Sequence, residues 1–138
     1  MLRHAGFDRA FAAMAAKGAL FVKGLSEAQT YGAGEQLDVP GRPEVVFTPG
    51  HTHGHCALHL RDRGVLLAGD AFVTYNPYTA TAGPQIVSGA ATADSAQALA
   101  SLDVLGATGA AVALTGHGEP WTAGIGAAVD RARAAGPS

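Results

Sequence analysis

Two short runs of the sequence contain only apolar residues, and they constrain the fold more than any other feature. Val65–Leu67 and Ala111–Leu114 show no alternation of apolar and polar residues. Strands with this continuous pattern are usually covered on both faces, as in sheets that carry helices. We therefore predict an α/β chain in which both runs are buried strands.

Two further strands are predicted before these runs. Val45–Phe47 is a short β-branched and aromatic run, and Cys56–Leu60 has the length and composition of a second strand. Arg61–Gly64 then supplies a turn that contains glycine. Residues 34–39 could form a short edge strand. Residues 71–90 have no clear period and contain two prolines, so we predict a loop there.

Three helices are predicted from apolar residues at helical spacing. The first helix covers Phe7–Lys17 and ends at Gly18 as a left-handed cap. The second covers about 95–106, with Asp94 or Ser95 as its N-cap, and the third covers Ile125–Ala135. The resulting order of helix, strands, loop, helix, strand and helix is typical of an α/β domain.

Composition excludes several classes of protein. Hydrophobic residues make up 48% of the chain and charged residues 14%, which is incompatible with intrinsic disorder. A formal net charge of −2 with no basic cluster predicts neither a nucleic-acid partner nor a membrane partner. The single cysteine, Cys56, cannot form an internal disulfide. We expect residues 1–138 to form a single cytoplasmic domain.

A polar side chain follows a glycine at the end of three predicted strands. These pairs are Gly50-His51, Gly69-Asp70 and Gly116-His117. Ligand sites gather at strand ends in α/β sheets, and two imidazoles with a carboxylate suit zinc or a similar metal. One such residue alone would be interpreted as a turn or helix cap. Three residues with the same pattern predict a metal site.

The segments around these residues resemble the metallo-β-lactamase fold hydrolases. Thr48–His55 resembles the family's TPGHTxGH segment. Gly64–Asp70 resembles the strand that ends in a metal-bridging aspartate, and Leu114–Pro120 resembles the late GHG segment. The resemblance begins at about Gly34 and matches the second half of the family's domain. The first metal motif of the family, HxHxDH, is absent from this sequence.

The resemblance implies a ligand set as well as a fold. His51 would bind one metal ion, His117 would bind the other, and Asp70 would bridge them as the catalytic carboxylate. Each ion then has only two protein ligands, whereas a catalytic zinc usually has about three. We therefore expect weak zinc binding by the isolated chain.

The implied activity is metal-dependent hydrolysis. In the family, two zinc ions lower the pKa of a bound water towards neutrality, so that it can attack a carbonyl or phosphoryl centre. Similarity to the glyoxalase-II-like branch implies a small-molecule ester or thioester as the substrate. The chain is expected to be truncated, with a misplaced start, and weak or inactive by itself.

The family's complete domain is an αββα sandwich, so the expected fold is half of it: one mixed sheet with helices on one face. The other apolar face would then be exposed, which monomers rarely tolerate. A homodimer or a partner covering that face is therefore expected, and a non-catalytic dimeric half-fold module is the alternative function. A third possibility is a simple metal-binding protein that uses His51, His53 and His55.

Several polar residues near the motifs are weaker candidates. His53 and His55 could replace missing ligands or hydrogen-bond to a ligand, and Glu119 could orient His117. Capping is an equally good explanation for Glu119. The candidate substrate contacts after Asp70 are Tyr75, Asn76 and Tyr78, although turn packing explains them equally well. His59 is predicted to be a surface or packing residue.

Overall fold

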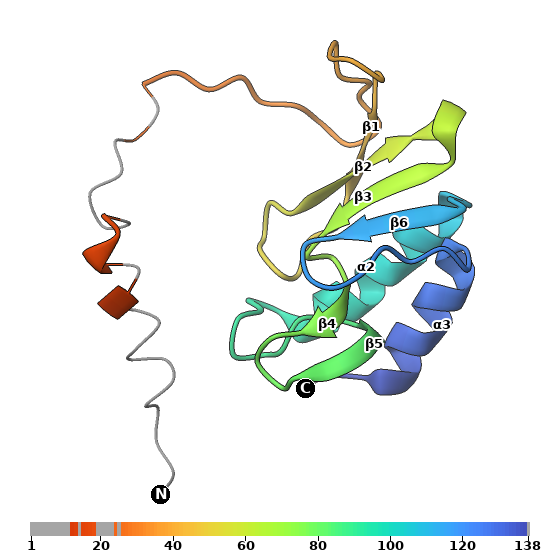
Figure 1. Ribbon diagram of the computed structural model, residues 1–138. Coiled ribbons are helices and arrows are strands. Elements are labelled where there is room, and N and C mark those ends of the chain that lie inside the picture. Colours follow the sequence, from red (N-terminus) through yellow and green to blue (C-terminus); the bar gives the residue numbers. More distant parts are fainter. Residues whose placement is uncertain (1–11, 14, 19–23, 25, 138) are drawn as a thin grey trace, which may run out of the picture. The chain divides into compact units, whose positions relative to one another are not determined.

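The computed structural model describes residues 12–13, 15–18, 24 and 26–137 (Figure 1). The chain divides into two units, Met1–Thr30 and Tyr31–Ser138. In the first unit residues 12–13 and 15–16 are helical, and Gly18 has a φ of 83°, as expected for a left-handed cap. The remainder of the helix predicted over Phe7–Lys17 lies outside the described residues.

The second unit contains a four-stranded mixed sheet with the strand order β1-β2-β3-β6 (Figure 1). β1 (Glu44–Phe47), β2 (Cys56–Leu60) and β3 (Val65–Gly69) are antiparallel neighbours, whereas β6 (Val112–Thr115) runs parallel to β3. All four strands lie within two residues of their predicted bounds. As a consequence of these directions, β1, β3 and β6 all end at the same edge of the sheet.

Two helices pack against one face of this sheet, as predicted. α2 (Ser95–Ala107) begins after Asp94, whose side chain accepts a hydrogen bond from the backbone N–H of Gln97 at 2.9 Å. α3 (Ile125–Ala135) has the predicted bounds. The core joins buried residues of the sheet with buried residues of both helices, among them Val46, Ala57, Leu66, Ala113, Leu102, Leu105, Ile125 and Ala128. None of the described helices has the length and apolar character needed to cross a membrane.

The opposite face of the sheet is also apolar. Val45, Leu58, Leu67 and Leu114 lie side by side across the four strands, and we call them the outer row. Exposure increases along the outer row, from 1% for Val45 to 39% for Leu114. Apolar residues on both faces explain why β3 and β6 show no alternating pattern in the sequence.

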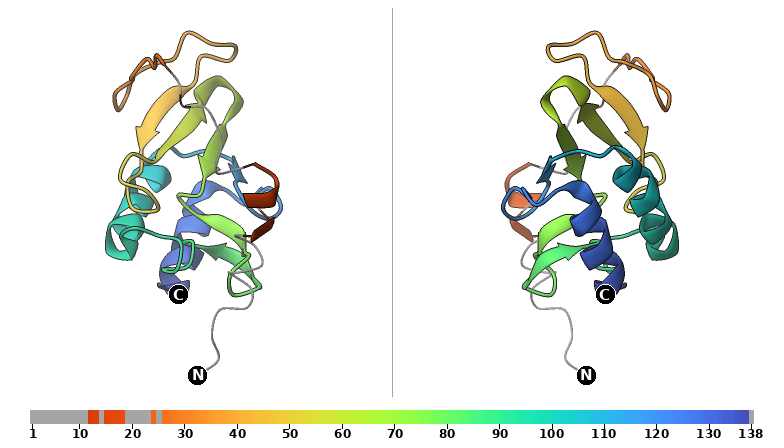
Figure 2. Two further views of the ribbon diagram at one scale, coloured as in Figure 1. Left: turned by 90° about the vertical axis from the view of Figure 1, so that its left-hand side faces the viewer. Right: turned by 90° about the vertical axis from the view of Figure 1, so that its right-hand side faces the viewer.

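The loop predicted over residues 71–90 is wrong, because this segment contains a β-hairpin. β4 (Val73–Asn76) and β5 (Thr81–Gln85) form a separate antiparallel sheet that packs against α3 (Figures 1 and 2). The register shifts between Val73 and Tyr75, and Pro84 lies within β5. Both features interrupt the two-residue period by which a strand is recognised.

Two smaller predictions have different outcomes. The turn at Arg61–Gly64 is confirmed as a 3-10 turn over Arg61–Arg63, followed by Gly64 in the left-handed conformation. The edge strand considered for residues 34–39 is reduced to an isolated bridge between Gln36 and Glu44.

Candidate metal centre

The structure brings His51, Asp70 and His117 together at the edge of the sheet where β1, β3 and β6 end. The Nε2 atom of His51 lies 3.5 Å from Oδ2 of Asp70, and the Nε2 atom of His117 lies 3.8 Å from Oδ1 of the same carboxylate. The two imidazoles therefore approach different oxygens of one carboxylate. The Asp70 carboxylate thus lies between the two imidazoles.

The loop that carries His51 is fixed against the start of α2. Gly50 has a φ of 138°, and a Cβ atom at this position would lie 2.3 Å from the backbone nitrogen of Ala98. The carbonyl of Pro49 accepts a hydrogen bond from the hydroxyl of Ser101 at 2.6 Å. The glycine before His51 is thus required both for its backbone conformation and for close packing.

The carboxylate of Asp70 lies against a second glycine. A Cβ atom at Gly116 would lie 2.3 Å from Oδ1 of Asp70, so this glycine leaves space for the carboxylate. Oδ1 of Asp70 and Nδ1 of His51 are buried and have no hydrogen-bond partner among the described residues. Leaving a buried acceptor unpaired is unfavourable, and a cation at Oδ1 would satisfy it.

His55 lies beside these residues but is held in hydrogen bonds. Its Nδ1 atom lies 2.8 Å from the hydroxyl of Thr48, and its Nε2 atom lies 3.2 Å from the backbone nitrogen of Asp70. Its ring packs edge-on to that of His51, with 6.0 Å between the ring centroids. Burial, together with the nearby His51, lowers the pKa of His55. Both ring nitrogens of His55 are therefore engaged in hydrogen bonds.

The loop that carries His117 is fixed by its backbone. The carbonyl of His117 accepts hydrogen bonds from the hydroxyl of Thr115 at 2.9 Å and from the backbone N–H of Thr74 at 3.1 Å. The hydroxyl of Thr74 also donates to the carbonyl of Glu119 at 2.7 Å. Thr74 was not recognised in the sequence, because its role requires β4 to lie beside the His117 loop. The backbone carbonyl of Glu119 thus helps to fix the loop, while the two roles considered for its side chain stay predictions.

The remaining candidates lie in different surroundings. Tyr75 and Tyr78 are exposed, at 42% and 57%, so both remain candidate substrate contacts. Asn76 is fully buried, and its side-chain oxygen accepts a hydrogen bond from the backbone N–H of Tyr78 at 3.1 Å. The structure thus favours turn packing for Asn76. His53 is exposed.

Within the described part of the chain, no group of three or more His, Cys, Asp and Glu side chains could hold one metal ion. The hypothesis of a simple site made of His51, His53 and His55 is therefore wrong, and the hydrogen bonds of His55 give the physical reason. The ligands around Asp70 fit zinc in their chemistry, since imidazole nitrogen and carboxylate oxygen are typical zinc donors. His51 with Asp70, and His117 with Asp70, give two protein donors for each ion, against about three at a catalytic zinc.

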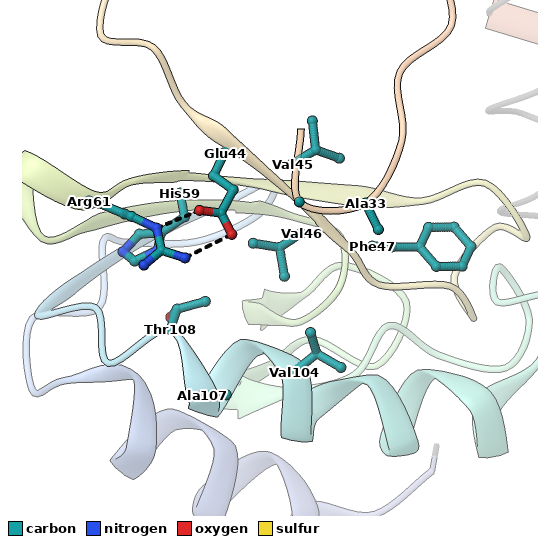
Figure 3. Close-up of a pocket in the computed structure, with 11 residues that line it drawn as sticks. Ala33, Glu44, Val45, Val46, Phe47, His59, Arg61, Val104, Ala107 and Thr108 are labelled. Carbon is teal, nitrogen blue, oxygen red and sulfur yellow. Dashed lines mark hydrogen bonds and ion pairs between the residues drawn. The ribbon is translucent and has the colours of Figure 1, made fainter. Parts of the chain in front are cut away.

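A cavity of about 310 Å³ lies away from these ligands, between the sheet and the end of α2 (Figure 3). Glu44 and Arg61 form a bidentate ion pair at its rim, with N···O distances of 2.5 and 2.8 Å. His59 lines the cavity, is 5% exposed, and has a pKa lowered chiefly by burial. His59 is thus a packing residue, one of the two roles predicted for it.

These observations define an α/β half-sandwich that presents His, Asp and His at one sheet edge. The chain matches the family described as the metallo-beta-lactamase superfamily over residues 2–117. It therefore belongs to the metallo-β-lactamase superfamily. None of the curated proteins compared with the chain matches it.

Two solved structures show the same fold over part of their length. A metallo-beta-lactamase family protein from Thermus thermophilus is 30% identical, with a TM-score of 0.62 over 95% of this chain and 44% of that one. A beta-lactamase domain protein from Burkholderia ambifaria is 22% identical, with a TM-score of 0.63 over 85% of this chain and 36% of that one. This chain thus spans less than half the length of either protein.

Proposed function

We propose that this chain forms the C-terminal part of a zinc-dependent hydrolase of the glyoxalase-II-like branch, with an ester or thioester as its substrate. The observation that carries the proposal is the position of the Asp70 carboxylate between the Nε2 atoms of His51 and His117. Membership of the superfamily supports hydrolysis as the reaction class. The branch and substrate class rest on the resemblance of the motifs, since one fold serves many substrates.

Each residue has a defined role in this proposal. His51 and Asp70 would hold one zinc ion, and His117 and Asp70 would hold the other. When bound, zinc lowers the pKa of water and polarises the substrate carbonyl. Gly50 and Gly116 keep the loops close enough for these donors to meet. The exposed Tyr75 and Tyr78 would contact the substrate beside the centre.

The two donors available to each ion imply that the centre is completed by other residues. We propose that a segment carrying the HxHxDH motif supplies them and belongs to the same protein in its full form. The proposal is supported by the length of the two similar structures, of which this chain covers 44% and 36%. By itself the chain would bind zinc weakly and turn over little or no substrate.

The single thiol, Cys56, agrees with a cytoplasmic location.

The proposal is tested by zinc titration calorimetry and thioesterase assays on this chain, before and after it is joined to the coding segment immediately upstream. We expect weak zinc binding by the chain, and tighter binding with turnover after joining. The variants His51→Ala and His117→Ala should each reduce zinc binding in both forms. An upstream segment without HxHxDH, or zinc binding unchanged in both variants, would refute the proposal.

The outer row favours a second candidate, a non-catalytic module that dimerises through the outer face of its sheet. Leu114 lies at one end of this apolar row and is 39% exposed, and exposed apolar surface marks interaction sites. Sedimentation equilibrium of the metal-free chain tests this candidate. It predicts a dimer that Leu114→Lys converts to a monomer, and a stable wild-type monomer would exclude it.

A further inference from the structure

A single peptide unit connects the three loops of the candidate centre. The peptide between Gly69 and Asp70 has its carbonyl bonded to the backbone N–H of Gly116 at 2.8 Å, which ties it to the His117 loop. Its N–H donates to Nε2 of His55 at 3.2 Å. His55 in turn belongs to the same loop as His51. Both ends of this peptide are thus held by the segments that carry the other two ligands.

The hydrogen bonds of His55 define its tautomer. A backbone N–H can only donate, so Nε2 of His55 must be an unprotonated acceptor. A neutral imidazole then carries its hydrogen on Nδ1, where the hydroxyl of Thr48 lies 2.8 Å away and accepts it. Thr48 is 1% exposed, and its own backbone N–H donates to the carbonyl of His55 at 3.0 Å. The buried Thr48 thus holds the imidazole ring in place on its Nδ1 side.

Gly69 provides the space that this contact requires. A Cβ atom at Gly69 would lie 3.0 Å from Nε2 of His55, and the residue has a φ of 53°. Most other residues would push the ring away from the peptide and strain the backbone. The imidazole of His55, Gly69 and the buried Thr48 therefore form one packed, hydrogen-bonded unit.

We propose that His55 is a positioning residue that locks the Gly69–Asp70 peptide and so holds the Asp70 carboxylate between His51 and His117. This role rests on the proposed function, in which the Asp70 carboxylate is shared by two ions. His55 itself donates nothing to the metal, since both of its ring nitrogens are engaged. Partners that orient a metal ligand commonly contribute about 10- to 100-fold to metal affinity.

The first test is made on the metal-free chain. Long-range ¹H–¹⁵N spectra of the imidazoles should show His55 with a protonated Nδ1 and an unprotonated Nε2. Hydrogen exchange of the Asp70 amide should be slow in the wild type, fast in His55→Leu and slow again in His55→Gln, whose side-chain oxygen can accept the same hydrogen bond. A protonated Nε2, or equal exchange in His55→Leu and the wild type, would overturn the proposal.

The second test is zinc titration of the same variants. His55→Leu should lose about 10-fold or more of the zinc affinity, and His55→Gln should recover most of it. His59→Leu is the matched control, because it removes a buried histidine of β2 that is remote from the ligands. It should leave zinc affinity unchanged even if it lowers stability. Equal loss of affinity in His55→Leu and His59→Leu would contradict the positioning role.

The two tests separate this inference from the proposed function. If the wild-type chain binds no zinc, the proposed function fails, but the tautomer and the Asp70 amide exchange still decide the role of His55. If zinc binds and the Asp70 amide is indifferent to His55, the positioning role fails and the proposed function stands. Circular dichroism of His55→Gln verifies that the comparison is made on a folded chain.

Discussion

At the residue scale, Asp70 combines a buried oxygen without a hydrogen-bond partner with two imidazoles directed at its carboxylate. Such a group costs stability when no cation is bound, because a buried unpaired acceptor is penalised by about 1–3 kcal/mol. Residues retained for function commonly carry such a cost. Removing the charge of Asp70 is thus expected to affect stability and metal binding in opposite directions.

Replacing Asp70 by Asn tests this opposition. Without metal and at about pH 8, where histidines are largely neutral, we expect the free energy of unfolding to stay equal or rise by about 1 kcal/mol. Zinc binding should fall to an undetectable level. Urea unfolding and zinc titration measure the two effects. Asp103→Asn, at an exposed residue of α2, is the control and should leave zinc binding intact.

Gly116 provides a second prediction at this scale. Gly116→Ala would place a Cβ atom 2.3 Å from Oδ1 of Asp70, so the carboxylate must move away from His117. We expect zinc affinity to fall by at least about 10-fold, as for other changes that misplace a ligand. Gly126→Ala, in the open on α3, should bind zinc normally and gain about 0.5–1 kcal/mol of stability from helix propensity. Equal zinc affinity in the two variants would contradict this account of Gly116.

How much of the site the sequence predicts depends on the kind of contact. The repeated pattern of strand, glycine and polar residue predicted that His51, Asp70 and His117 meet. The pairing of Thr48 with His55 requires the register of β1 against β2, and that of His55 with the Asp70 peptide requires the register of β2 against β3. No local pattern contains either register. For the same reason, Asn76 was considered as a substrate contact although it is buried in its own turn.

At the element scale, the site depends on three strands that end at one edge of the sheet. The strands themselves were predictable, because β3 and β6 are short apolar runs bounded by glycine. The β4–β5 hairpin was not, since its register shift removes the alternating pattern. Its contribution is nevertheless direct, because Thr74 on β4 fixes the His117 loop.

The packing of the His51 loop on α2 is tested by two glycines of that loop. Gly50→Ala should lower the free energy of unfolding by more than about 2 kcal/mol, because the new Cβ would overlap the backbone of Ala98 and the φ of 138° is strained for alanine. Gly54→Ala has nothing within 4 Å and should change stability by less than about 0.5 kcal/mol. Urea unfolding decides between them, and equal losses would mean that this contact is unimportant.

At the scale of the whole molecule, two histidines with lowered pKa values make stability depend on pH. Burial lowers the pKa of both His55 and His59, whereas histidines of the unfolded chain titrate near about 6.5. Below that value the unfolded state binds more protons than the folded state, so stability is present above about pH 6.5 and is lost as the pH falls.

We therefore expect the free energy of unfolding of the metal-free chain to decrease on acidification below about pH 6.5. Urea unfolding at a series of pH values measures this decrease. The double variant His55→Gln/His59→Gln should flatten the profile in that window. A stability that increases on acidification through the same window would contradict the lowered pKa of both histidines.

The apolar outer row is the other feature at this scale, and it was predicted from the two continuous runs. What covers it was not predictable, because the sequence shows that a face is apolar without showing its neighbour. The dimer and the segment with HxHxDH are the two proposals for that neighbour, and sedimentation of the metal-free chain and joining of the upstream segment separate them.

The central claim is that His51, Asp70 and His117 supply this chain's share of a zinc centre. Anomalous diffraction at the zinc edge from zinc-soaked crystals tests it most directly. The account predicts zinc within about 2.0–2.2 Å of the Asp70 carboxylate and of Nε2 of His51 or His117. Zinc bound only elsewhere, for example at His53, with the Asp70 carboxylate free of metal, would contradict it.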